Sequence, residues 1–196
     1  MPVTVVEEFD AVKITNASIQ FIEGGTQQPG TKFGCIGTIE GETELNEFVK
    51  NCEGVETKKI VRPIRINLTI SGHIPVKVAR DIFGLSNEDL KPGVYAYGAD
   101  SKGKNFVLTA DVIDEFQDIT KLIAFSNCVS NTGLVITIEN GADELAELEM
   151  EYTVMQDSNK KFYYEALVDE LEDQTVVTQW HTQFTSDLVK ATVPTP

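Results

Sequence analysis

The sequence predicts a mainly β protein, a β-sandwich or barrel with one flanking α-helix and a long N-terminal hairpin loop. Short β-rich runs recur along the chain, and turn residues separate them roughly every ten positions. Only 75–83 has clear helical spacing. The 196 residues, of which 41% are hydrophobic, suffice for one domain with a real core. We expect residues 1–175 to form this domain and 176–196 to form a C-terminal strand or arm that is partly flexible.

The first third of the chain predicts a long hairpin. Residues 11–22 and 32–40 are its two β-rich runs. The loop 23–30 between them contains the turn-forming pairs Gly24-Gly25 and Pro29-Gly30. We expect the tip of this loop to be polar and mobile. The next stretch, 42–52, is ambiguous, because its apolar residues keep helical spacing but the stretch is short enough to be another strand.

The stretch 59–71 is the clearest strand in the sequence. Ile64, Ile66, Leu68 and Ile70 share one face, and Pro63 within the run indicates a sheet edge or a bulge. The following stretch, 75–83, is predicted to be the helix, since proline suits a first helical turn and Gly84 suits its end.

The rest of the chain predicts further strands. We expect 94–98 and 105–116 to form a second hairpin, Asn140-Gly141 to be a turn, and more strands at 122–129, 134–139 and 175–184.

The stretch 145–156 has the strictest pattern in the sequence. Leu148, Met150, Tyr152 and Val154 alternate with Glu147, Glu149, Glu151 and Thr153, which predicts a strand with one apolar and one acidic face. A second β-rich run at 161–168 predicts that this strand belongs to a hairpin. The glutamates lie about 6.6–6.8 Å apart along a strand, and three like charges at this spacing disfavour a sheet. A solvated face, a calcium site and a working electronegative surface are the three interpretations. A straight strand wraps a cation poorly.

The charge of the chain is strongly negative and unevenly distributed. Net charge is −15 with a pI near 4.4, which excludes ordinary nucleic-acid binding. Residues 139–173 contain twelve acids, whereas 58–82 contain six bases. One copy can therefore present a basic region to the acidic region of the next, or both can face water. Arg62 and Arg65 are candidate inter-subunit anchors on this reasoning, although exposure on a strand face is the commoner role.

The sequence contains no recognisable catalytic or cofactor motif. Phosphate loops, dinucleotide fingerprints, nucleophile elbows and metal-binding His/Cys clusters are all missing. His73 and His181 are expected to bond to neighbouring groups, and Cys35, Cys52 and Cys128 to be small buried residues rather than nucleophiles. An acid-pair hydrolase built on Glu149 and Glu165 has no supporting environment. We therefore expect no enzyme, no metal and no cofactor. The three cysteines and the acidic N-terminus favour a reduced, intracellular place of folding, and no apolar run could span a membrane.

Two stretches resemble the major tail (tube) proteins of long-tailed bacteriophages and prophages. The run 58–85, KKIVRPIRINLTISGHIPVKVARDIFGL, resembles the middle of these proteins, and 148–167, LEMEYTVMQDSNKKFYYEAL, resembles their closing hairpin. The resemblance covers about residues 14–171. It implies a β-sandwich with a flanking helix that forms hexameric rings, in which strands of all subunits build one inner barrel. The rings stack into a tube with an electronegative lumen, through which DNA passes during ejection.

The resemblance gives roles to particular residues. Glu147, Glu149 and Glu151 would line the lumen. Inter-subunit contacts would involve Arg62, Arg65 and, in the loop between the first two predicted strands, Gly24, Gly25, Gln27 and Gln28. The implied partners are further copies of the chain, a tape-measure protein, tail terminator or completion proteins, and DNA that passes without specific binding, with no membrane. The implied location is the virion tail, assembled in the cytoplasm of a bacterial host. A tail terminator, a contractile-tail tube protein and a non-viral β-sandwich binding module are the alternatives.

Overall fold

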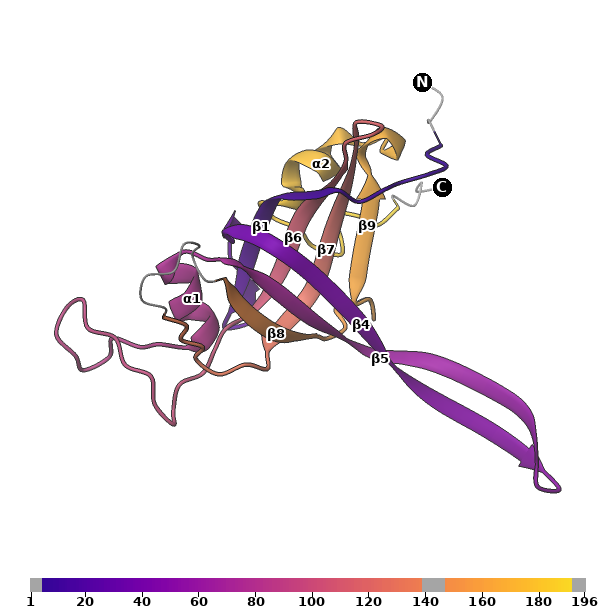
Figure 1. Cartoon of the computed structure of the whole chain (residues 1–196), viewed down its shortest axis with the longest axis horizontal. Helices are drawn as coiled ribbons and strands as arrows, with labels where there is room; N and C mark the ends of the chain where they lie inside the picture. The colour runs from indigo at the N-terminus through magenta and orange to yellow at the C-terminus, as the bar shows by residue number, and fades with distance from the viewer. Residues whose placement is uncertain (1–4, 139–146, 192–196) are drawn as a thin grey trace, which may run out of the picture.

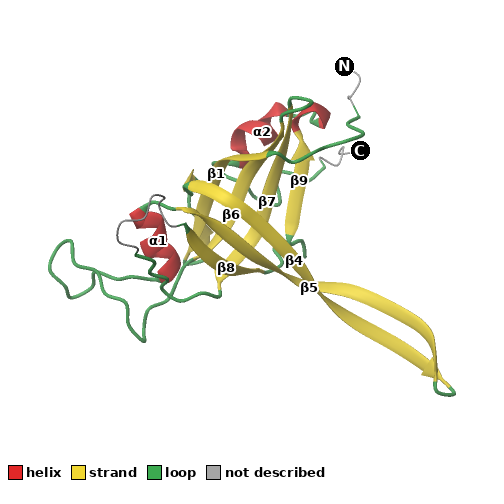
Figure 2. Ribbon diagram, in the orientation of Figure 1, coloured by secondary structure: helices red, strands yellow, loops and turns green. Residues whose placement is uncertain are grey.

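The protein is mainly β, built as one antiparallel open sheet with two helices (Figures 1 and 2). The structure, a computed structural model, describes residues 5–138 and 147–191. Within these residues the sheet has nine strands in the order β2-β1-β6-β7-β8-β5-β4, while β3 pairs with β1 and β9 pairs with β7. The strands are β1 (Lys13–Glu23), β2 (Thr26–Gln27), β3 (Thr31–Lys32), β4 (Cys35–Cys52), β5 (Val55–His73), β6 (Asn105–Asp114), β7 (Ile119–Ser130), β8 (Leu148–Val154) and β9 (Tyr163–Leu167).

The sheet bends over on itself and encloses the main core. In Figure 1, β5 and β4 cross over β1 and β6, and residues from both parts of the sheet join one buried cluster. β8 leads from one part to the other, because it pairs with β7 only at its end and with β5 along its whole length. The cluster contains Ile19 and Phe21 of β1, Leu68 and Ile70 of β5, Phe106 and Leu108 of β6, and Met150 and Tyr152 of β8.

Helix α1 (Val76–Phe83) closes one end of this core, as the sequence predicts. Val78, Ile82 and Phe83 form its buried stripe, which follows the three- and four-residue spacing of one helix face. Gly84 ends the helix with a φ of 73°, and its backbone N–H donates to Arg80 O. The predicted end at this glycine is therefore confirmed.

The C-terminal part forms a second helix, and the predicted last strand at 175–184 is wrong. Helix α2 (Gln174–Trp180) begins after Asp173, whose carboxylate accepts hydrogen bonds from the Thr175 backbone and hydroxyl at 2.9 and 2.7 Å. Val176 and Trp180, four residues apart, are both buried. They pack against the far face of β6 and β7, where Val107, Leu122 and Ala124 join them in a second core. A short 3₁₀ turn, η1 (Val168–Glu170), links β9 to this segment.

The long hairpin of the structure is β4–β5, not the predicted N-terminal one. β1 turns back at Gly24-Gly25 into the two-residue strand β2, and β4 pairs with β5 along the entire length of both strands. The ambiguous stretch 42–52 is thus strand. Pro63 lies beside a register shift between Glu44 and Leu45, beyond the last residue of β5 that pairs with β8. Of the two predicted alternatives, the structure shows the bulge.

Two further hairpin predictions are also wrong. β8 and β9 do not pair with each other; β9 pairs with the first half of β7. Residues 94–98 form only the bridge between Ser86 and Ala96, while β6 pairs with β7. No strand forms within 134–138. Asn140-Gly141 lies outside the described residues. The turn at 157–160 does form, with Lys160 N donating to Asp157 O.

Candidate functional site

β8 has one core-facing side and one acidic side, as its alternation predicts. Leu148 is half-buried, and Met150, Tyr152 and Val154 are completely buried in the main core. Glu147, Glu149 and Glu151 are exposed. Thr153 continues their side of the strand but is buried, and its hydroxyl forms hydrogen bonds with the side chain of Asn131. The structure therefore places the three glutamates on the outside of the folded subunit.

The acidic side extends across the neighbouring strands β5 and β4. Residues opposite each other in adjacent strands share a face, so the register aligns Glu151 with Thr69 and Glu40. The next row aligns Thr153 with Asn67 and Glu42. We call this outer surface the acidic face; its exposed carboxylates are Glu40, Glu42, Glu147, Glu149 and Glu151.

Glu40 and Glu42 were missed by the sequence reasoning, although a signal for them exists. The run 39–44, Ile-Glu-Gly-Glu-Thr-Glu, alternates with period two. Glu40 ends the predicted strand 32–40, whereas Glu42 begins the ambiguous stretch 42–52, so the sequence does not place the two acids on one face. The structure pairs the run 39–44 with β5 and thereby brings them beside the predicted glutamates.

Among the residues that the structure describes, a basic side chain lies only at the border of the acidic face. Arg65 Nε donates to Glu44 Oε2 at 2.6 Å, where the β4–β5 pair leaves the body. Glu147 Oε2 accepts a hydrogen bond from Ser71 Oγ at 2.8 Å. The remaining carboxylates face solvent, and β5 contributes neutral hydroxyl and amide groups between the two acidic strands.

The repulsion between these carboxylates is small in water but grows in a narrow space. Two charges about 7 Å apart interact by roughly 0.6 kcal/mol at the dielectric constant of water. Salt screens them beyond about 8 Å at physiological ionic strength. The sheet therefore tolerates the acidic face. The acidic face repels another polyanion only when the gap between the two surfaces is close to the screening length, about 8 Å, or shorter.

The outer part of the β4–β5 hairpin projects far from the body (Figure 1). We call residues 45–64 the arm. Its large apolar side chains are 43% to 66% exposed, and they lie on both faces of the ribbon. An isolated two-stranded hairpin is marginally stable in water, and exposed apolar surface of this extent marks an interaction site. The exposed apolar residues are Leu45, Phe48, Val49, Val55, Ile60, Val61 and Ile64.

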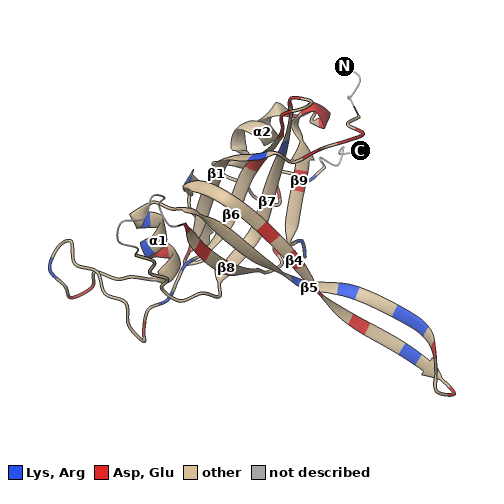
Figure 3. Ribbon diagram, viewed as in Figure 1, with Lys and Arg blue, Asp and Glu red and all other residues tan. Residues whose placement is uncertain are grey.

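The arm carries basic residues as well as apolar ones (Figure 3). Arg62 lies on it, with its guanidinium carbon 6.0 Å from the centre of the Phe48 ring, a distance at which cation–π attraction operates. Lys59 forms an ion pair with Glu47 at 2.7 Å. Arg62 is thus on the arm, whereas Arg65 sits at its root, and both are exposed.

The loop 23–30, whose tip the sequence predicts to be polar and mobile, is hydrogen-bonded to other parts of the fold. Gln27 Nε2 donates to Gln20 Oε1 at 2.6 Å and to Phe184 O at 2.5 Å. Gln28 N donates to Phe21 O at 2.8 Å. Gly24 and Gly25 form the turn and have open space around them. The contact role of these four residues remains a prediction, and the arm is the longer projection.

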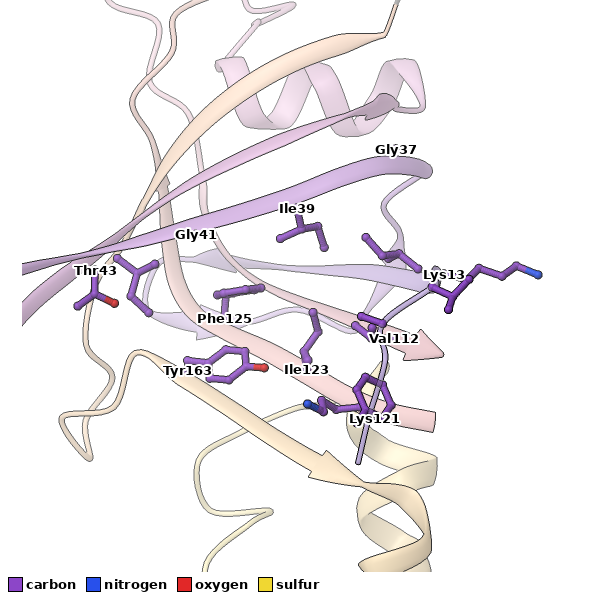
Figure 4. A pocket seen from close by; sticks show the side chains of 15 residues that line it. Lys13, Gly37, Ile39, Gly41, Thr43, Val112, Lys121, Ile123, Phe125 and Tyr163 are labelled. Atoms are coloured by element: carbon purple, nitrogen blue, oxygen red, sulfur yellow. The ribbon is translucent and has the colours of Figure 1, made fainter. Parts of the chain in front are cut away.

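An apolar cleft opens between the two parts of the sheet (Figure 4). Its volume is about 620 Å³. Ile39 of β4 points toward Ile123 and Phe125 of β7, and Tyr163 of β9 lies at one side. Phe9, Ala11 and Val12 of the N-terminal segment also line it. We call this hollow the cleft.

The histidines and cysteines occupy structural positions. His181 Nε2 lies 2.7 Å from Asp111 Oδ1, and His181 Nδ1 lies 3.0 Å from Thr109 Oγ1. Cys128 is completely buried, and this burial raises the pKa of its thiol. His73 is exposed. Cys35 and Cys52 are also exposed, so the prediction that the cysteines are buried is correct for Cys128 and wrong for these two, which lie at the two ends of β4. No cluster of three metal-ligating side chains occurs among the residues that the structure describes.

Comparison with known proteins adds no assignment. No protein-family model matches the chain, and no curated protein matches it. No helix in the described part of the chain is long and apolar enough to cross a membrane.

Proposed function

We propose that this chain is the subunit of a phage tail tube, in which hexameric rings stack and the acidic face lines the lumen. The observation that carries the proposal is the acidic face itself. Five exposed carboxylates lie on one surface of the three-stranded part β8-β5-β4, where Glu147, Glu149 and Glu151 come from β8 and the residue before it, and Glu40 and Glu42 from β4. The resemblance of 58–85 and 148–167 to tail tube proteins covers β5 and β8, two of these three strands.

An acidic wall suits the passage of DNA. Phosphates bind where lysine and arginine displace counterions, and the acidic face offers no such groups inside its border. Its field acts over about a Debye length, roughly 8 Å. In a narrow channel this range keeps a polyanion from settling on the wall, so the DNA slides instead of binding.

The open sheet supplies a strand for joining copies. β4 is the last strand in the sheet order and spans Cys35–Cys52, so one long backbone edge faces away from β5. Such an edge pairs with other chains unless it is covered. Pairing between neighbouring subunits covers it, and repeated pairing around a ring closes a barrel. The exposed apolar arm gives the contact that bridges copies. The proposed partners are therefore other copies first, then tape-measure and terminator or completion proteins.

The cleft favours one alternative function, a binding module that takes a ligand between its sheet layers. Its apolar and aromatic lining is the concave patch that such a module needs. The two functions differ in the state of the pure protein. A tube subunit assembles into rings or tubes at high concentration, whereas a binding module stays monomeric. A terminator stops at one ring, so the length of the polymer separates it from a tube protein.

The test of the lumen assignment replaces Glu147, Glu149 and Glu151 by glutamine together. These side chains are exposed, so the variant is expected to fold and to form tubes. DNA ejection from assembled virions should become slower, because the wall no longer repels phosphate. The matched control replaces Glu7, Glu8 and Glu88, which are exposed and lie away from the acidic face. Unchanged ejection kinetics with intact tubes would count against the assignment.

A further inference from the structure

We propose that the cleft receives the arm of a second copy of this chain, so that copies join head to tail. This inference rests on the proposed function and deepens it by naming the two surfaces that meet.

The core-facing side of β4–β5 continues without interruption from the core to the arm. Ile70 pairs with Ile39 and is completely buried. Four residues further out, Ile66 pairs with Thr43, and both line the cleft. The next pair on this side, Leu45 and Pro63, already belongs to the arm. The body of the subunit therefore covers the core-facing side of β4–β5 as far as Thr43 and Ile66. It does not cover this side in the arm.

The arm carries exposed apolar side chains on the side that faces the core nearer its root. Beyond Leu45, this side carries Val49 and Val61, which are 46% and 43% exposed, and the ion pair between Glu47 and Lys59 at 2.7 Å. Burying the apolar side chains favours docking, whereas the ion pair contributes little.

The cleft offers a lining of the same kind. Ile14, Val112, Ile123 and Phe125 contribute to it from the layer opposite β4. A volume of about 620 Å³ falls in the range, roughly 300–1,000 Å³, of pockets that enclose small ligands. The cleft thus has room for apolar side chains from one side of an arm, not for the whole ribbon.

Charge does not hold the two surfaces together. Lys13 and Lys121 line the cleft, but each is already within ion-pair distance of a carboxylate of its own subunit, Glu115 at 3.5 Å and Glu165 at 3.8 Å. The ammonium of Lys121 lies 4.3 Å from the centre of the Phe9 ring at the cleft. The tip of the arm carries Glu53 and Glu56, with Lys50 and Lys58 beside them. Because exposed ion pairs contribute little to binding, the docking depends on apolar contact.

The length and direction of the arm select a second copy as the occupant. Eight residues of β4 from Leu45 onward extend about 26 Å at 3.3 Å per residue. A compact chain of this size has a radius of gyration of about 16 Å, so the arm reaches past its own body. It projects away from the body (Figure 1), and it begins next to Thr43 and Ile66, which line the cleft. Each copy therefore has an arm and a cleft on different surfaces, which is a heterologous interface that builds rings or filaments.

The main experiment uses two variants that each damage one surface. Val49→Asp places a charge on the arm, and Val12→Asp places one at the cleft, where Val12 is 50% exposed. Each variant alone should need at least about tenfold more protein to assemble, because a carboxylate must be buried. An equimolar mixture should form pairs and nothing larger, since one intact arm and one intact cleft remain. Mass photometry measures the species.

Val76→Asp is the matched control, because Val76 is 65% exposed on α1, away from both surfaces. This control should assemble like the wild type, and circular dichroism should show that all three variants fold. Docking is overturned if the mixture does not pair, if Val76→Asp assembles as poorly as the two variants, or if the wild type stays monomeric at about 1 mM, where even weak contacts are populated.

A cross-link separates this inference from the proposed function. p-Benzoylphenylalanine at position 49, irradiated in the assembled wild-type background, should cross-link to residues 9–14, 37–43 or 121–125 of another copy. Tubes with cross-links at 86–104 or between two arms would overturn the docking and leave the tube standing. Head-to-tail pairs with these cross-links but without rings would uphold the docking and overturn the tube.

Discussion

His181 shows how single side chains attach the C-terminal segment to the sheet. Its ring bridges Asp111 and Thr109 of β6, and its backbone carbonyl accepts a hydrogen bond from Ser18 Oγ at 2.6 Å. Thr109 is completely buried, so its hydroxyl is closed to any substrate from solvent. The hydroxyl, imidazole and carboxylate groups of these three residues form a hydrogen-bonded chain like that of a catalytic triad. Here this chain is structural and fixes α2 against the sheet.

Replacing this histidine should lower the stability of the fold. His181→Ala leaves the mostly buried Asp111 carboxylate with Asn16 as its remaining partner, at 2.6 Å. Leaving buried polar groups without partners costs about 1–3 kcal/mol. Urea unfolding followed by circular dichroism measures the change. His73→Ala, at an exposed position, should change the free energy of unfolding by less than about 0.5 kcal/mol. Equal effects of the two substitutions would contradict the structural role.

At the scale of elements, the end of α1 depends on a glycine for two separate reasons. Gly84 has a φ of +73°, and a Cβ on it would lie 2.4 Å from the backbone carbon of Lys102. The left-handed conformation alone costs other residues roughly 1–2 kcal/mol. The close approach of the 102–104 backbone adds a second cost at Gly84, because backbone atoms have little freedom to move away.

Two glycine substitutions separate these costs. Gly93 has a φ of +86° and no neighbour within 4 Å of an added Cβ. Gly93→Ala should therefore lose only the conformational part, about 1–2 kcal/mol. Gly84→Ala should lose distinctly more, measured as the difference in unfolding midpoint at equal slope. If the two variants are equally stable, the close contact between Gly84 and the backbone of Lys102 adds no cost to the free energy of unfolding.

The sequence predicts elements best where one local pattern decides them. Period-two alternation in β8 correctly predicts which side faces the core, and the stripe of α1 with Gly84 correctly predicts that helix. Strand partners depend on contacts far apart in the chain, so β9 was wrongly paired with β8. The C-terminal helix was missed because β-branched residues at 176–177 outweighed the cap at Asp173 and the four-residue spacing of its buried side chains.

The candidate site was only partly predictable for the same reason. The glutamates of β8 were assigned correctly to an outer face, but Glu40 and Glu42 join them only through the pairing of β4 with β5. The apolar residues of the arm, such as Phe48 and Ile60, look like core residues in the sequence; only the fold shows that no part of the described chain covers them. The cleft depends on how the sheet bends, which no local pattern encodes.

At the scale of the whole molecule, assembly brings together copies that each carry a net charge of −15. Long-range repulsion between them opposes association, whereas apolar docking of the arm favours it. The repulsion acts between all charges closer than the Debye length, about 30 Å at 0.01 M salt and 10 Å at 0.1 M. Repulsion should therefore dominate at low ionic strength.

Added salt should consequently promote assembly of the pure protein. Raising NaCl from about 20 mM to about 500 mM shortens the Debye length from roughly 20 Å to roughly 4 Å, which screens repulsion between copies but leaves apolar docking of the arm intact. Light scattering at a series of protein concentrations should show rings or tubes at lower concentration in high salt. Dissolution of the assemblies by salt would mean that ion pairs, not apolar contacts, hold the copies together. The Val49→Asp variant should gain little from salt, because screening does not restore an apolar surface to the arm.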